Sequence, residues 1–159
     1  GVKAVGKSLA FLENLTSFSL TLAGCENVGN VAVAAVGKGL GSLSKVTTVM
    51  LRVNECNDVG DVGLKAVGKG LGALKNLADL TLDLASCDEL GDVGVRALGK
   101  GIASLQNLLR LSLTISDCPS IGDAGVKALG EGLGSLKGLL KLALSLLERK
   151  DVGDAGLKA

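Results

Sequence analysis

The sequence predicts an α/β fold: a right-handed solenoid, or horseshoe, with a concave parallel β-sheet and convex helices. Two observations predict it. One 31-residue unit recurs without insertion or deletion, starting at residues 31, 62, 93 and 124, with a partial unit at 155. Within each unit the hydrophobic spacing changes from a helical to a strand-like period. We expect residues 1–159 to form a single array of about five repeats that is a fragment of a longer array.

The first half of each unit is predicted to be a helix. In the unit that starts at residue 62, apolar residues are spaced by three, four and three positions, which places them on one helical face. These residues are Leu64, Val67, Leu71 and Leu74. The segment is also rich in glycine, and each interior glycine costs roughly 1 kcal/mol relative to alanine. We expect the small residues to let neighbouring helices approach closely, so that stacking offsets this cost.

A carboxylate or amide side chain stands at the start of each predicted helix. The residues in this column are Asn30, Asp61, Asp92, Asp123 and Asp154. Such side chains accept hydrogen bonds from the free N–H groups of the first helical turn. We therefore expect them to be the N-caps of their own helices.

The second half of each unit is predicted to be a strand. Leu80, Leu82 and Leu84 alternate with Thr81 and Asp83, as a half-buried strand requires. The corresponding segments are 15–22, 46–53, 77–84, 108–115 and 139–146. Because they recur in the same direction with helices between them, they should form a parallel sheet in which the helices are crossovers.

Side chains that alternate with the buried leucines should project from the concave sheet, and these positions vary between units. The candidate partner-binding residues are Thr48, Met50, Arg52, Asp79, Thr81, Asp83, Arg110, Ser112, Thr114 and Lys141. Asp79 and Asp83 form an acidic centre flanked by arginine and lysine. The alternative is that these charges merely compensate one another. Five strands of eight residues would present on the order of 500 Å², less than the roughly 800 Å² per partner of a standard interface.

The residues from one strand to the next helix follow a recurring pattern, L-x-x-L-x-L-x-L-x-x-C-x-x-[VLI]-G-D-x-G-x-x-[AV]-[VL]-G-x-G-[LI]. This pattern resembles leucine-rich repeats of the ribonuclease-inhibitor-like class and covers the whole chain. The resemblance implies the solenoid described above and a concave sheet that binds proteins. Two more residues precede the cysteine than in the usual pattern of that family. The strand or its exit turn should therefore be longer than the family norm.

Four cysteines occupy one column of the repeat: Cys25, Cys56, Cys87 and Cys118. Stacked strands would place them in a line with a spacing of about 4.8 Å. Four points on a line cannot converge into a tetrahedral zinc site, so we expect no metal. Disulfides between neighbours are geometrically conceivable. We favour a ladder of reduced, buried thiols that help to satisfy backbone groups at the turn.

Gly1 to Ser8 match the phosphate-binding pattern G-x-x-x-x-G-K-S letter for letter. The same columns recur as GLKAVGKG at 63–70 and GVRALGKG at 94–101, where they belong to repeat helices, and no strand precedes the first copy. We therefore expect a helix and no nucleotide. The chain has no histidine, and no acid–base or nucleophilic constellation recurs outside the repeat columns. We expect no enzyme and no cofactor.

Seventeen basic and sixteen acidic residues give a net charge of +1, which offers no general reason to expect nucleic acid as a partner. The most apolar run, residues 139–147, is far shorter than the roughly 20 residues of a transmembrane helix. Basic residues nevertheless recur in two helical columns four positions apart, on one face. They are Lys3, Lys65, Arg96, Lys127 and Lys158, with Lys7, Lys38, Lys69 and Lys100. We interpret this stripe as a solvated helical back, with contact to an anionic surface as the alternative.

The two outermost units keep apolar residues in columns that should be buried, namely Phe18 and Leu20 in the first and Leu142 and Leu144 in the last. Solenoids need polar capping repeats to shield their ends. We therefore expect further repeats or a neighbouring subunit to continue the array end to end.

These observations predict a non-catalytic protein–protein interaction module or scaffold that uses the concave sheet, with a protein partner of unknown identity. Two alternatives stay open. One is a structural subunit of a larger assembly, in contact through its ends and helical back; the other is an idealised array without a specific ligand. Reduced thiols favour an intracellular, cytoplasmic location. The glycosylation sequon at Asn14 has meaning only in a secreted chain and is interpreted as a chance match.

Overall fold

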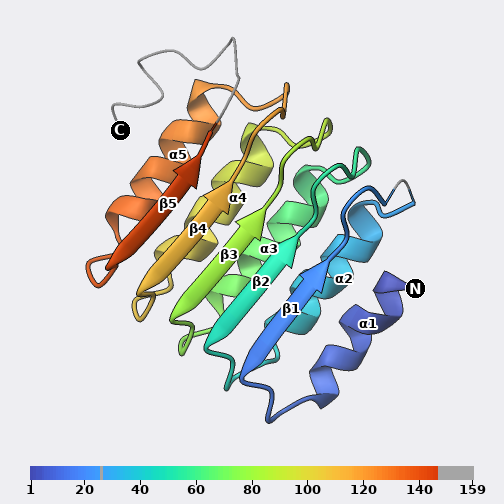
Figure 1. Ribbon diagram of the computed structural model, residues 1–159, viewed down its shortest axis with the longest axis vertical. Coiled ribbons are helices and arrows are strands. Elements are labelled where there is room, and N and C mark those ends of the chain that lie inside the picture. The colour runs from blue at the N-terminus through green and yellow to red at the C-terminus, as the bar shows by residue number, and fades with distance from the viewer. Residues whose placement is uncertain (26, 147–159) are drawn as a thin grey trace.

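The computed structural model describes residues 1–25 and 27–146, which form one five-stranded parallel sheet with helices along one of its faces (Figure 1). Strands follow one another in the sheet in chain order. The elements are α1 (Val2–Ser8), a short 3-10 helix (Leu9–Phe11), β1 (Ser17–Thr21), α2 (Asn30–Leu40), β2 (Thr48–Arg52), α3 (Asp61–Gly72), β3 (Asp79–Asp83), α4 (Asp92–Ala103), β4 (Arg110–Thr114), α5 (Asp123–Gly134) and β5 (Lys141–Ser145). The predicted alternation of helix and strand is confirmed.

Every strand pairs with the next at a separation of 31 residues. Phe18 is opposite Val49, Val49 is opposite Leu80, and the row continues through Leu111 to Leu142. All four pairings are parallel, which confirms the predicted sheet and its register. Each paired strand has five residues, however, and is shorter than the eight-residue segments predicted.

The hydrophobic core lies between the sheet and the helices. Leu80 and Leu82 on β3 face Leu64 and Leu71 from α3, and all four side chains are at most 1% exposed. Because the spacing is two in the strand and three or four in the helix, both elements turn one apolar face inward. The same columns are buried in the neighbouring repeats, so a single continuous core runs through the solenoid.

Glycine columns bring neighbouring helices together at backbone distance. A methyl group at Gly70 of α3 would overlap the carbonyl oxygen of Gly37 in α2. At Gly101 of α4 it would overlap the carbonyl oxygen of Gly68 in α3. The hypothesis that small residues permit close helix stacking is thus confirmed.

The predicted role of the polar residues at the helix starts needs a correction, because they do not cap their own helices. The N-cap residues of α2, α3, α4 and α5 are Gly29, Gly60, Gly91 and Gly122, and none of these four helix starts has a side-chain capping bond from its own N-cap. Each glycine has an extended backbone. The polar residue comes one position later, as the first residue inside the helix.

From this position the polar side chain caps the helix of the next repeat. Asp92 begins α4, and its Oδ1 accepts hydrogen bonds from the backbone N–H groups of Gly122 at 2.7 Å and Gly125 at 2.9 Å, at the start of α5. Equivalent bonds join Asp61 to Gly91 and Gly94, and Asn30 to Gly60 and Gly63. The capping interaction therefore ties successive repeats together. Asp154, Lys158 and the partial unit at 155 lie outside the described residues.

The residues before each cysteine lie in the turn that follows the strand. Glu55, Ser86 and Asp117 have left-handed backbone conformations, with φ of 58°, 56° and 52°. Gly24 is in the corresponding position of the first repeat, with φ of 62°. That the strand or its exit turn is longer than the family norm stays a prediction.

Candidate interaction surface

One face of the sheet carries the predicted partner-binding residues, and no described segment covers it (Figure 1). We call it the open sheet face and define it by three rows across β2 to β5. The first row is Thr48, Asp79, Arg110 and Lys141; the second is Met50, Thr81, Ser112 and Ala143; the third is Arg52, Asp83, Thr114 and Ser145. The register thus brings together all ten predicted residues on neighbouring strands. Their role in binding stays a prediction.

One ion pair is present on this face among the described residues. The Nε of Arg110 lies 2.8 Å from Oδ2 of Asp79, and both side chains are partly exposed. Asp83, in the third row, instead accepts a hydrogen bond at its Oδ1 from the N–H of Ala85 at 3.3 Å. Local charge compensation, the alternative reading of this surface, therefore applies to Asp79 but not to the whole acidic centre.

A hollow of about 600 Å³ lies at the β4–β5 side of the open sheet face. Arg110 and Lys141 line it together with Leu140 and Leu142, whose side chains are 77% and 49% exposed. Leu140 was not among the predicted contact residues. The available signal was its column, which reads Thr16, Thr47, Ala78, Leu109 and Leu140 and so becomes apolar in the last two repeats.

The cysteine column lies in the core beside the strand exits. Cys56, Cys87 and Cys118 are fully buried, and the cysteines in the described part of the chain are thiols rather than disulfides. Cys87 donates a hydrogen bond from its Sγ to the carbonyl oxygen of Val53 at 3.1 Å, and Cys56 donates one to that of Leu22 at 2.8 Å. These bonds cross from one repeat to the one before it. The predicted role of the thiols in satisfying turn carbonyls is confirmed.

Burial keeps the thiols of Cys56 and Cys87 protonated. It raises the pKa of Cys56 above its ordinary value of 9.0 and the pKa of Cys87 to about 12. Since the thiolate is the nucleophile and the metal ligand, protonated buried thiols are poor at both tasks. Among residues 1–25 and 27–146, no group of three histidine, cysteine or acidic side chains is placed to hold a metal ion.

A family model described as "Leucine Rich repeat" matches residues 80–99 and 105–130. The matched residues include parts of β3 and α4, all of β4 and most of α5. The remaining repeats keep the same columns and the same 31-residue register as these two. The chain is built of leucine-rich repeats. Its units, each with a helix and a parallel strand, resemble those of the ribonuclease-inhibitor-like class.

Two solved structures share this leucine-rich repeat fold. One, titled leiomodin-1 actin-binding site 2, has a TM-score of 0.64 and 16% sequence identity, over 90% of this chain and 78% of its own. The other, the tropomodulin C-terminal domain from Caenorhabditis elegans, has a TM-score of 0.65 and 10% identity, over 94% of this chain and 85% of its own. At these identities the likeness concerns the fold alone. No curated protein sequence matches the chain.

The segment that matches the phosphate-binding pattern is part of the first repeat helix. Val2 to Ser8 form α1, which packs against α2. A methyl group at Gly6 would overlap the backbone of Ala35, so this glycine serves helix stacking. The predicted helical interpretation of residues 1–8 is confirmed.

The helical side of the leucine-rich repeats presents the predicted basic residues to solvent. Lys3, Lys7, Lys38, Lys65, Lys69, Arg96, Lys100 and Lys127 are all exposed, and Lys158 lies outside the described residues. None of these eight forms an ion pair within the described residues. No helix in the described parts of the chain has both the length and the apolar character needed to cross a membrane.

Proposed function

We propose that this leucine-rich repeat protein is a non-catalytic interaction module whose open sheet face binds a protein partner. The observation that carries the proposal is a face without a covering layer in the described residues, on which polar and charged side chains vary while the alternate residues of the same strands stay apolar. Such variation on a constant frame changes the partner without changing the fold. The fold itself supports this function by analogy only.

Charge on the open sheet face suggests the chemistry of the partner. Arg52 at one side and Lys141 at the other are exposed and form no ion pair within the described residues. Asp83 keeps its second carboxylate oxygen without a hydrogen bond there. A complementary partner would therefore present acidic groups toward the two flanks and a donor or basic group toward the centre.

Size constrains how the partner binds. Five strands of five residues span roughly 20 Å by 17 Å, or about 340 Å². A standard interface needs about 800 Å² per partner. The partner must therefore extend beyond the strands, and the adjoining hollow with its exposed Leu140 is the apolar surface that it would reach first.

The test compares the double variant Asp79→Lys, Asp83→Lys with a matched reversal on the helical back, Lys65→Glu, Lys69→Glu. Each protein is immobilised, and the proteins captured from cell extract are quantified by mass spectrometry. We expect the sheet variant to lose partners that the back variant retains. The proposal would be overturned if both variants captured the same proteins in equal amounts. It would also be overturned if neither variant captured more protein than a blank surface.

Actin is a specific first probe, because the leiomodin-1 structure with the same fold is titled as an actin-binding site. Cosedimentation with actin filaments, and gel filtration with monomeric actin, test it directly. Binding that the Asp79→Lys, Asp83→Lys variant abolishes would support actin as the partner. Absence of binding would exclude actin and leave the capture experiment to decide the wider proposal.

The last strand favours a second candidate function, that of a structural subunit in a larger assembly. Leu142 and Leu144 on β5 are 49% and 40% exposed, whereas Leu80 and Leu82 in the same two columns are at most 1% exposed. Any cover for these two leucines comes from outside the described residues. Sedimentation velocity of the protein over a wide concentration range distinguishes this function, because only end-to-end contact predicts growth of the assembly with concentration. The buried thiols support an intracellular site for either function.

A further inference from the structure

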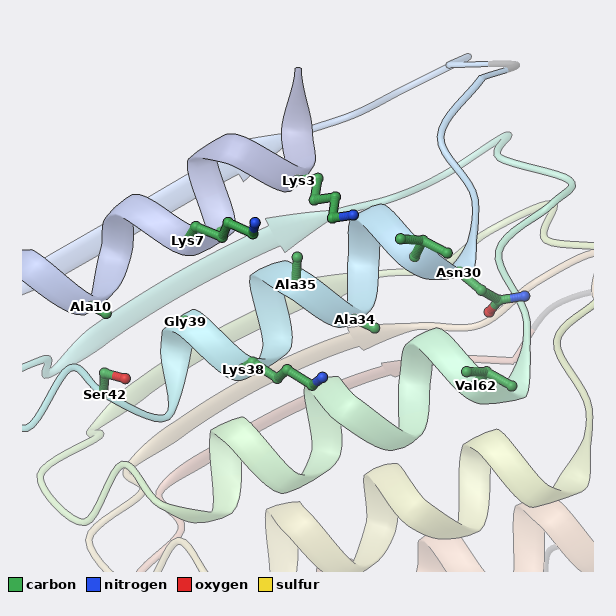
Figure 2. A pocket seen from close by; sticks show the side chains of 12 residues that line it. Lys3, Lys7, Ala10, Asn30, Ala34, Ala35, Lys38, Gly39, Ser42 and Val62 are labelled. Atoms are coloured by element: carbon green, nitrogen blue, oxygen red, sulfur yellow. The ribbon is translucent and has the colours of Figure 1, made fainter.

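The helical back contains a hollow of about 600 Å³ over α2, between α1 and α3 (Figure 2). Its floor consists of small residues, including Ala34, Ala35 and Gly39. Val31 from α2 and Val62 from α3 add apolar surface at one end, and each is 67% exposed. The hollow lies on the side of the molecule opposite to the open sheet face.

A single break in the repeat accounts for the hollow. Ala34 stands in a column that otherwise holds long basic side chains, in Lys3, Lys65, Arg96 and Lys127. The alanine removes both the bulk and the charge of the side chain that would cover α2. The corresponding hollow between α4 and α5, where the column is complete, is about 290 Å³ and has Glu131 in its lining.

Three lysines surround the apolar floor. Lys3 and Lys7 come from α1, where a separation of four residues places them one helical turn apart on the same face. Lys38 comes from α2. None of the three has an ion-pair partner among the described residues, and no acidic residue lines the hollow. The site is thus an uncharged depression with positive charge around it.

We propose that this hollow binds an acidic peptide segment of another protein, with one bulky apolar side chain over Ala34 and flanking carboxylates toward Lys3, Lys7 and Lys38. The apolar side chain gains by leaving water for the alanine and glycine floor. The carboxylates gain from the surrounding charge. Both features are needed, because a depression this open binds little without charge, and exposed lysines alone select no particular anion.

Two other anionic partners match the hollow less well. A lipid headgroup layer is anionic and planar, and it offers no protruding apolar side chain to occupy a depression between helices. Nucleic acid offers phosphates, but proteins that bind its single strands stack the bases on aromatic side chains, and no aromatic residue lines the hollow.

The probe is a synthetic pentapeptide with one phenylalanine flanked by two glutamates on each side, titrated into the isotopically labelled protein and followed by NMR. We expect amide shifts to concentrate at Ala34, Ala35 and Lys38, with none in the smaller hollow beside Glu131. Replacing the phenylalanine by alanine in the peptide should weaken binding about tenfold or more, since it removes most of a buried side chain. Shifts that do not depend on the phenylalanine, or no shifts at millimolar peptide, would overturn the proposal.

The decisive variant is Ala34→Lys, which restores the residue of the other repeats and should therefore fold. It fills the hollow while it adds a positive charge. We expect it to weaken binding of the phenylalanine peptide about tenfold, whereas a general electrostatic attraction would strengthen binding. The control Ala73→Lys adds the same charge at an exposed position that does not line the hollow, and it should leave the affinity within about twofold.

Vesicles with and without phosphatidylserine test the membrane source of anions. We expect vesicle binding to be absent or to increase with Ala34→Lys, as simple charge attraction requires. Vesicle binding that is tighter than peptide binding, and that Ala34→Lys abolishes, would overturn the assignment to a peptide. Thermal melting of each variant verifies that a loss of binding does not reflect a loss of fold.

Discussion

Replacing Asp92 by alanine should destabilise the repeat that follows it rather than the repeat that contains it. The carboxylate begins α4, yet its Oδ1 accepts hydrogen bonds from Gly122 and Gly125 at the start of α5. The N–H of Gly94 in α4 is bonded instead to Asp61. In Asp92→Ala the first turn of α5 therefore loses its cap, while the first turn of α4 keeps its own.

The magnitude follows from two terms. Loss of a capping side chain costs typically about 1 kcal/mol. Loss of a negative charge at a helix N-terminus costs about another 0.3–1 kcal/mol. We expect a total of about 2 kcal/mol, which corresponds to a roughly 30-fold change in the local opening equilibrium. Asp92→Asn should cost less than half as much, because Asn30 makes the same two bonds in the second repeat.

Native-state hydrogen exchange measures this effect at each amide. Exchange at Gly122 and Gly125 should become about 30-fold faster, and exchange at Gly94 should not change. The control is Asp88→Ala, which removes an exposed carboxylate that forms no hydrogen bond within the described residues. Faster exchange at the start of α4, with α5 unaffected, would refute the assignment of the cap to the next repeat.

Three further predictions concern the packing and the charges. Gly101→Ala should lower the melting temperature although alanine is the better helix former, because its methyl group overlaps the neighbouring helix; Gly134→Ala, with open space around it, should not lower it. Burial raises the pKa of Cys87 from 9.0 to about 12, so the contribution of this thiol to stability is complete below pH 9 and is lost as the pH rises toward 12. In urea unfolding at stepwise pH, the free energy of unfolding should fall more steeply above pH 9 in the unmodified protein than in Cys87→Ala. Equal declines in the two proteins would contradict this. Arg110→Ala should change the free energy of unfolding by less than about 1 kcal/mol, since the pair with Asp79 is exposed; a larger loss in urea unfolding would indicate a structural role for this pair.

The main elements of the fold could be predicted because the constant spacing of the repeat determines the register of the strands. Leu80 and Leu82 are two residues apart, and Leu64, Val67 and Leu71 are three and four apart, so the strand and the helix each have one possible buried face. A constant 31-residue spacing then fixes which residues lie side by side on adjacent strands. All predicted contact residues on the open sheet face followed from these two facts.

The direction of capping could not be predicted in the same way. Asp92 is close in sequence to the start of α4, but in space it also lies beside the start of α5. Which N–H groups it reaches depends on the offset between the two helices. That offset is set by backbone contact at glycines such as Gly99 and Gly132, and a sequence pattern does not specify it.

The hollow on the helical back was visible in the sequence only as Ala34 in a column of basic residues. Its extent depends on where the side chains of Lys3, Lys7 and Lys38 point, which the repeat does not determine. Strand length was also beyond the sequence pattern. Leu77 and Leu84 at the ends of the predicted segment are buried like strand residues, although the paired strand comprises only Asp79–Asp83.

The most direct test of this structure is an NMR measurement of nuclear Overhauser effects between backbone protons of adjacent strands. Stacked repeats predict contacts between Leu51 and Leu82 and between Leu82 and Leu113, in the pattern of a parallel sheet. Contacts in an antiparallel pattern, or none between residues 31 positions apart, would contradict the fold and both surfaces assigned to partners.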